Sequence, residues 1–315
     1  MDNSSFFIIF TLTEPKAAKS DKHIYFALSL ILYLLIIILN LILIVTILLE
    51  KSLHEPMYIF LCNLCINGLF GTAGFYPKFL SNLFCDMYVI SYVGCSLQAF
   101  VIYCSVMCEF TTLTVMSYDR YVAICKPLDY HSVMTNSTLI ILLLFSWLFP
   151  AFSMSTLLVL SNRLPLCGSH IDKLYCDNWS IVKLSCDPVT INNIYGLIII
   201  LIYFCLVIFI ISSYCKLISA CTKSIENKNK FMHTCLPHLL SLVNFTVALF
   251  FDSMDTRYGS KDFPQSLRNF MILEYLIIPP IFNPVIYGLK LTEVRKRALS
   301  VFIRVKVTDS SVKKR

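Results

Sequence analysis

Long apolar runs dominate the pattern of the chain, and the run at residues 24–49 is the clearest of them. Ser29, Asn40 and Thr46 are its clearly polar, non-aromatic residues, and its polarity does not alternate. An α-helix needs about 20 apolar residues to cross the hydrocarbon core of a bilayer, whereas a transmembrane β-strand needs about 10 residues of alternating polarity. The run therefore predicts a membrane-spanning helix.

Six further runs of similar length follow, so the sequence predicts an all-α membrane protein built as a seven-transmembrane helix bundle. The expected spans are 24–49, 57–80, 92–124, 138–160, 192–218, 232–253 and 269–289. Asn67, Glu109 and the Pro279-Pro280 pair interrupt three of them. Such groups need partners from neighbouring helices or a water-filled cavity. The interruptions favour a bundle with a functional interior over a set of membrane anchors.

The distribution of positive charge predicts the orientation of the bundle. Residues 1–10 lack the basic region of a cleavable signal peptide, so we expect the first helix to target the chain. With the N-terminus outside, the segments placed inside hold more Lys and Arg than those outside, as the positive-inside rule requires. We expect an extracellular tail over 1–23, the transmembrane domain over 24–289, and a cytoplasmic basic tail with a short amphipathic helix over 290–315. That tail could be attracted to anionic lipid or dock a cytosolic partner.

Composition removes several classes of function. With 57% apolar and 14% charged residues, the chain is far from a soluble domain, which carries about 25% charged residues. The HExxH, Ser-His-Asp and GxGxxG patterns of enzymes are absent, so we predict neither an enzyme nor a cofactor, and no nucleic-acid partner. A transporter or channel would be expected to show internal repeats or rings of intramembrane charge, and Glu109 alone is securely intramembrane. A receptor remains the favoured class.

The fourteen cysteines are scattered rather than arranged in paired CxxC motifs, so no zinc site is predicted. Four of them lie toward the expected outer face, where an oxidising environment permits disulfides. These are Cys95, Cys167, Cys176 and Cys186. Four cysteines allow three connectivities, and spacing alone does not choose among them.

Two motifs near the inner ends of the third and seventh spans are more specific. The third span ends in Met116-Ser117-Tyr118-Asp119-Arg120-Tyr121, and the seventh contains Asn283-Pro284 followed by Tyr287. Together they resemble the rhodopsin-like G-protein-coupled receptors, in the wording of the odorant receptor branch. Segments 53–58 (LHEPMY), 230–239 (KFMHTCLPHL) and the cysteine-rich loop 164–186 extend the resemblance over nearly the whole chain.

This resemblance implies a function as an odorant receptor that binds small odorant molecules within the bundle. It implies activation of a stimulatory olfactory-type heterotrimeric G protein, which raises cyclic AMP, at the plasma membrane of sensory cilia. A non-olfactory chemosensory receptor is the alternative. The implied coupling residues are Asp119, Arg120, Tyr121, Tyr214, Asn283, Pro284 and Tyr287. The resemblance also implies the disulfides Cys95–Cys176 and Cys167–Cys186 and glycosylation at Asn3.

In the implied mechanism Asp119 holds the permanently charged Arg120 until the inner helix ends separate. Helical spacing from the landmarks suggests a set of mostly apolar pocket residues, for which bundle core is the alternative interpretation. They are Ile102, Tyr103, Val106, Ile198, Ile202, Leu249 and Ser253. Asp252 and Asp255 could attract a cationic ligand, but a solvated loop edge is the favoured interpretation.

The sequence also departs from the family it resembles. Gly68 stands where the family usually carries an inward Asp, so Glu109 alone remains of a two-carboxylate sodium site and no metal is predicted. Asn67 precedes Gly68 and should point about 100° around the helix from it. Phe245-Thr246-Val247 stands where the family has Phe-Tyr-Gly, which argues against a switch that relies on a phenol there.

Overall fold

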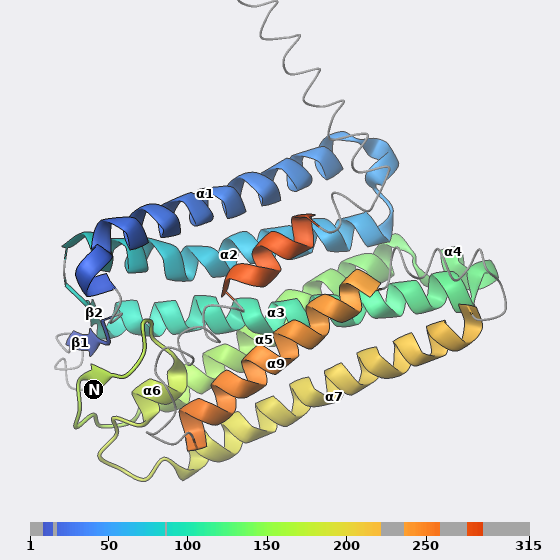
Figure 1. Cartoon of the computed structure of the whole chain (residues 1–315). Coiled ribbons are helices and arrows are strands. Elements are labelled where there is room, and N and C mark those ends of the chain that lie inside the picture. The colour runs from blue at the N-terminus through green and yellow to red at the C-terminus, as the bar shows by residue number, and fades with distance from the viewer. Residues whose placement is uncertain (1–8, 15–17, 86, 222–235, 259–275, 286–315) are drawn as a thin grey trace, which may run out of the picture.

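The structure, a computed structural model, describes residues 9–14, 18–85, 87–221, 236–258 and 276–285. Asn3, Tyr287, the tail 290–315 and parts of the sixth and seventh predicted spans lie outside these residues. The described part is mainly helical, and its long helices lie lengthwise beside one another (Figure 1).

The long helices follow the predicted spans. They are α1 (Ala18–Leu49), α2 (Pro56–Cys85), α3 (Tyr92–Cys125), α5 (Asn136–Ser161), α7 (Thr190–Cys221) and α9 (Leu236–Tyr258). A shorter apolar helix, Leu276–Val285, follows α9 in the chain. Within the described ranges, α1, α2, α3, α5 and α7 are long and apolar enough to cross a membrane. Several helices run past the predicted boundaries, because backbone hydrogen bonding continues beyond the apolar stretch that the pattern detects.

Three short strands form a small sheet that the sequence did not predict. They are β1 (Ile9–Leu12), β2 (Val89–Ser91) and β3 (His170–Ile171), in the order β2-β1-β3. β1 runs antiparallel to β2 and parallel to β3. Phe10 and Leu12 of β1 are buried while Ile9 and Thr11 are exposed, so the strand buries one face, as the two-residue period of a strand requires.

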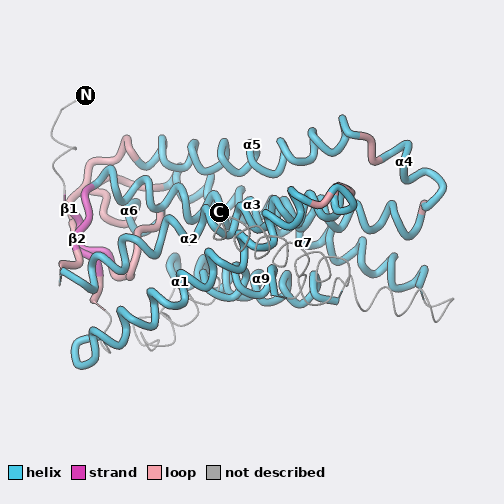
Figure 2. Tube along the Cα trace, turned by 90° about the horizontal axis from the view of Figure 1, so that it is seen from above, coloured by secondary structure: helices cyan, strands magenta, loops and turns pink. Residues whose placement is uncertain are grey.

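The sheet and the short helix α6 (Asn178–Val182) lie at one end of the bundle, and α4 (Tyr130–Val133) lies at the other, in both views (Figures 1 and 2). We call these the sheet end and the α4 end. The 3₁₀ turns η2 (Lys51–Leu53) and η3 (Pro127–Asp129) follow α1 and α3. Hydroxyl and carboxylate caps begin three helices: Ser91 accepts from Gly94 N in α3, Thr135 caps α5 and Asp177 caps α6.

α3 is the central helix of the bundle and contacts α2, α5 and α7. Its apolar side chains are mostly buried, whereas α1 and α7 expose many leucines and isoleucines, such as Leu28, Ile31 and Leu201. An apolar exterior of this extent suits a lipid surrounding rather than water. The Pro279-Pro280 interruption finds a partner in this interior, since Asn40 Nδ2 donates a 2.8 Å hydrogen bond to the carbonyl of Pro280.

Candidate ligand-binding and coupling sites

A cavity of about 140 Å³ lies among α3, α5, α6, α7 and α9. Its wall is largely apolar and aromatic, with Phe110 of α3 and Val207 of α7 among its members. Four of the expected pocket residues line this cavity, namely Tyr103, Val106, Leu249 and Ser253. Ile102 instead lines a second, smaller cavity of about 30 Å³, together with Glu109. A third pocket of about 560 Å³ lies among β1, β2, α2 and α3 and contains none of the expected pocket residues. We call the cavity of about 140 Å³ the larger cavity, since it is the larger of the first two.

Ile198 and Ile202 were placed on the wrong face of α7. Both are exposed on the outside of the bundle, while Ile199, Tyr203 and Val207 line the cavity at intervals of four residues. Each residue turns an α-helix by about 100°, so an offset of one position moves a side chain from the cavity to the exterior. α7 is apolar on all sides, and its pattern therefore carried no signal for the inward face.

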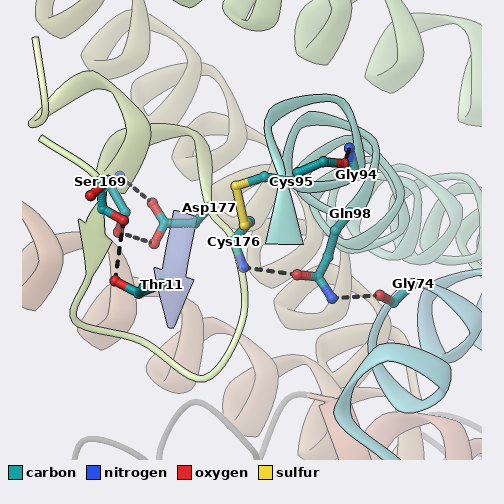
Figure 3. The surroundings of a disulfide bond; sticks show 10 residues. Thr11, Gly74, Gly94, Cys95, Gln98, Ser169, Cys176 and Asp177 are labelled. Atoms are coloured by element: carbon teal, nitrogen blue, oxygen red, sulfur yellow. Dashed lines mark hydrogen bonds between the residues drawn. A yellow bond between two sulfur atoms is a disulfide. The ribbon is translucent and has the colours of Figure 1, made fainter. Parts of the chain in front are cut away.

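The loop between α5 and α7 (residues 162–189) is tied down over the sheet end. A disulfide joins Cys95 of α3 to Cys176 of the loop, with an S–S distance of 2.05 Å, and a second joins Cys167 to Cys186 within the loop. Figure 3 shows Gln98 beside the first disulfide: its Oε1 accepts from Cys176 N at 2.9 Å and its Nε2 donates to the Gly74 carbonyl at 3.0 Å. The loop is thereby linked through α3 to α2.

A buried ionic cluster fastens the same loop to α9. Lys173 Nζ lies 2.7 Å from Asp252 Oδ1 and 2.9 Å from Asp177 Oδ2, and all three side chains are at most 5% exposed. Tyr103 donates a 2.8 Å hydrogen bond to Asp252 Oδ2. Asp252 is therefore not at the solvated loop edge expected from the sequence, because the folded loop covers it and supplies its counter-charge.

The two loop members of the ionic cluster keep their charges. Burial alone lowers the pKa of Lys173, but the carboxylates of Asp177 and Asp252 outweigh burial and hold that pKa above its usual value. Burial alone raises the pKa of Asp177, but Lys173 and the hydrogen bonds from Ser180 outweigh it and hold that pKa below its usual value. Near neutral pH Lys173 and Asp177 are thus a charged pair.

Arg257, near the end of α9, also lines the cavity and is held by neighbours. Its guanidinium lies 4.0 Å from the ring centroid of Trp179, and its Nη1 donates a 2.6 Å hydrogen bond to Asn193 Oδ1. No local sequence signal marks Lys173 or Arg257. Lys173 reaches Asp252, a lining residue, only because the loop folds over the bundle, and Arg257 is held at the cavity by Asn193 of α7 and Trp179 of α6.

At the α4 end, Asp119 and Arg120 form a direct pair. Asp119 Oδ2 accepts from Arg120 Nε at 2.9 Å and from Nη2 at 2.5 Å, while Asp119 Oδ1 accepts from the Tyr130 hydroxyl at 2.8 Å. Asp119 is fully buried. Beside this pair, Lys216 Nζ lies 5.9 Å from the ring of Tyr121, and Tyr214 is buried in α7.

Asn283 is not brought to Arg120 but to Glu109, deeper in the bundle. Asn283 Nδ2 donates to Glu109 Oε1 at 2.8 Å, and Asn67 Nδ2 donates to Oε2 at 3.3 Å. Asn67 points to a different neighbour from Gly68, as its position on the helix predicts, and that neighbour is the helix that carries Glu109. Pro284 is buried in the same helix as Asn283. Two amide N–H donors suit a carboxyl group, whereas a cation needs oxygen ligands, so this arrangement does not favour sodium.

Comparison with known proteins identifies the family. The family model described as olfactory receptor matches residues 28–305. The chain belongs to the olfactory receptor family. It is similar to human olfactory receptor 51E1, with 36% identity over 280 residues and 86% of each chain covered. It is also similar to human olfactory receptor 52D1, with 33% identity over 275 residues and 86% of each covered, and to rat olfactory receptor 1468, with 30% identity over 317 residues and 98% of each covered.

As an olfactory receptor, the chain is a multi-pass membrane protein with the seven-helix bundle that the sequence predicted. α9 overlaps the sixth predicted span and continues past it to Tyr258, and the helix Leu276–Val285 lies within the seventh. The family consists of receptors rather than enzymes. We therefore interpret the larger cavity as a candidate ligand site and the Asp119–Arg120 pair as a candidate coupling site.

Proposed function

We propose that this olfactory receptor binds small odorant molecules in the larger cavity and activates a stimulatory olfactory-type heterotrimeric G protein, which raises cyclic AMP. The observation that carries the proposal is the pairing of two features on one helix. α3 lines the cavity with Tyr103, Val106 and Phe110 and holds Arg120 against Asp119 near the α4 end. A change in how α3 packs against its neighbours would affect both places.

The odorant acts through its differential affinity for two packings of the bundle. In one packing Asp119 holds Arg120; in the other the pair separates and the guanidinium is offered to the G protein. We assign Tyr121, which follows Arg120 on α3, and Tyr214, which is buried in α7, to the coupling site at this end. Asn283 and Pro284 belong to the helix whose Asn283 contacts Glu109. Moving a population from 1:99 to 99:1 would need about 5.5 kcal/mol, so a small odorant is expected to shift a modest gap.

The proposal includes an orientation. The disulfides gather at the sheet end, which suits an oxidising exterior, and the α4 end then faces the cytosol and the G protein. In this orientation the tail 1–23, which contains Asn3, is extracellular and the transmembrane domain covers 24–289. Tyr287 lies at the inner end of that domain, and the basic tail 290–315 is cytoplasmic. The lipid bilayer surrounds the exposed apolar faces, and the plasma membrane of sensory cilia is the proposed location.

A pair of substitutions on α7 tests the proposal. Val207 lines the cavity, whereas its neighbour Ile208 is exposed on the outside of the bundle. Val207→Phe should fill part of the cavity and abolish the cyclic AMP response to an odorant panel, while Ile208→Phe should leave the response intact. Receptor at the cell surface is measured for both. Equal responses of the two variants would contradict the assignment of the cavity.

The coupling assignment has its own variant. Arg120→Ala should abolish odorant-evoked cyclic AMP in cells that contain the olfactory G protein, with surface display largely retained, because the guanidinium serves coupling rather than core packing. An unchanged cyclic AMP response would show that Arg120 is not part of the coupling site.

A further inference from the structure

Two buried hydroxyl groups in the wall of the larger cavity have no partner. They belong to Tyr203 of α7, whose side chain is 6% exposed, and to Thr246 of α9. Neither hydroxyl makes a hydrogen bond to any residue that the structure describes. Buried polar groups are nearly always hydrogen-bonded, so such exceptions point to a missing partner.

Thr246 stands out from the other threonines of the described helices. Six of them donate a hydrogen bond to the carbonyl four residues earlier, which satisfies the hydroxyl within its own helix. They are Thr46, Thr72, Thr111, Thr114, Thr156 and Thr256. The Thr246 hydroxyl makes no such bond within the described residues, so it remains available at the cavity.

The charged groups of the cavity wall nearer the sheet end are already paired with protein partners. Asp252 accepts hydrogen bonds from Lys173 and Tyr103. Arg257 donates a hydrogen bond to Asn193 and stacks on the Trp179 ring. A ligand group would have to break these bonds to replace them. The Trp179 indole N–H, next to the Arg257 guanidinium, is a third unpartnered donor of this wall, at the sheet end. Away from the charged groups, the hydroxyls of Tyr203 and Thr246 are the unpartnered polar groups of the described wall that a ligand can satisfy without loss.

The surroundings of these hydroxyls favour an uncharged ligand group. The Phe110 ring lies 5.9 Å from the Tyr203 ring and 4.9 Å from the Phe245 ring, centroid to centroid. The charged members of the wall lie toward the sheet end, and Asp252 is six residues, or about 9 Å, along α9 from Thr246. A carboxylate or ammonium group beside Tyr203 and Thr246 would lose its hydration without gaining a counter-charge. A neutral oxygen can accept a hydrogen bond from each hydroxyl.

We propose that the Tyr203 and Thr246 hydroxyls bind the neutral oxygen of a small uncharged odorant, a ketone, aldehyde or alcohol, whose carbon chain packs against the apolar wall. The cavity is close to the ~150 Å³ of an engineered apolar cavity that holds benzene, so ligands of about the size of benzene or slightly larger fit. This assignment rests on the proposed function only in taking the larger cavity as the ligand site.

The test is a binding measurement that does not require signalling. The full-length receptor is purified in lipid nanodiscs, and affinities for 2-hexanone, 1-hexanol, hexane, hexanoate and hexylamine are obtained from the ligand-dependent rise in melting temperature. In the wild type, the ketone and the alcohol should bind more tightly than the carboxylate and the amine. Tyr203→Phe and Thr246→Val remove one hydroxyl each while keeping the shape, and each should weaken ketone and alcohol binding about two- to tenfold. Hexane binding should not change.

Tyr76→Phe is the matched control. The Tyr76 hydroxyl is likewise buried and without a partner in the described part of the chain, but it belongs to α2 and does not line the larger cavity. This variant should bind all five compounds as the wild type does. Retained hexane binding shows that each variant is folded.

Three results would overturn the assignment: tighter binding of hexanoate or hexylamine than of the neutral oxygen compounds, ketone and alcohol affinities unchanged in both hydroxyl variants, or no binding of any compound. Selective binding of the ketone and alcohol without any cyclic AMP response would contradict the proposed function and support the assignment of the hydroxyls.

Discussion

Tyr130→Phe is expected to raise the signalling of the receptor in the absence of odorant. The Tyr130 hydroxyl donates a 2.8 Å hydrogen bond to Asp119 Oδ1, while Asp119 Oδ2 holds Arg120. Burial and the Asp119 carboxylate raise the pKa of Tyr130, so the phenol stays protonated and donates this bond. The bond joins α4 to α3 in the packing that holds Arg120, and its loss weakens that packing alone.

The size of the effect follows from the strength of this hydrogen bond. A hydrogen bond to a charged group contributes about 1.5–3 kcal/mol, and Tyr130 is only partly buried, which favours the lower value. Since about 1.4 kcal/mol corresponds to a factor of ten, the population with Arg120 released should rise about tenfold. Cyclic AMP accumulation without odorant, divided by the number of receptors at the surface, reports this population.

Tyr118→Phe is the control, because it removes a phenolic hydroxyl one position before Asp119 that has no hydrogen bond to the described residues. It should leave signalling without odorant unchanged. If Tyr130→Phe and Tyr118→Phe both signal as the wild type does, the Tyr130–Asp119 bond does not restrain Arg120 and the reasoning is refuted.

Four further predictions concern other parts of the bundle. Lys173→Met should cost about 3–5 kcal/mol of stability, seen as a lower melting temperature, because it leaves buried carboxylates without their counter-charge; a melting temperature within 1–2 °C of wild type would contradict this. Because the pKa of Lys173 is raised, its contribution to stability is fully present below its unfolded pKa of about 10.4 and is lost at higher pH. Because the pKa of Asp177 is lowered, its contribution to stability is present above its unfolded pKa of about 3.9 and is lost in stronger acid. The melting temperature should therefore show no loss from this pair between about pH 5 and 9. Cys95→Ala should prevent surface delivery, since it frees the loop from α3, and labelling of Cys95 in the intact wild type by a membrane-impermeant alkylating reagent would show that the disulfide is absent. Replacing sodium by a bulky organic cation should leave signalling unchanged, because amide donors occupy both oxygens of Glu109, whereas Gly68→Asp should introduce sodium sensitivity; sodium dependence of the wild type that is lost in Glu109→Gln would disprove this.

The sequence predicted best where one physical signal dominates. Apolar runs long enough to span a bilayer located the helices, and the paired motifs around Arg120 and Asn283 indicated the family. Where the apolar pattern has no polar side, as in α7, it could not fix which face points inward, and Ile198 was placed on the cavity side in error.

Features made by loops and by distant segments were not predictable from local pattern. β1 is four residues long, too short for its alternation to be distinguished from an ordinary tail, and its partners lie far away in the chain. The ionic cluster joins Lys173 of a loop to Asp252 of α9, and no local signal relates these two positions. Asn67 reaches Glu109 because it faces α3, where its Nδ2 also donates to the Ser105 carbonyl, whereas Gly68 faces Asn40 and Pro280.

The central claim is that a ligand in the larger cavity releases Arg120 to a G protein, and nucleotide exchange in a reconstituted system tests it most directly. Purified receptor in nanodiscs is mixed with the olfactory heterotrimeric G protein, and guanine nucleotide exchange is followed with and without a compound that binds the cavity. The wild type should accelerate exchange when the compound is present, and both Val207→Phe and Arg120→Ala should abolish that acceleration. Ligand-dependent exchange that persists in both variants would contradict the account.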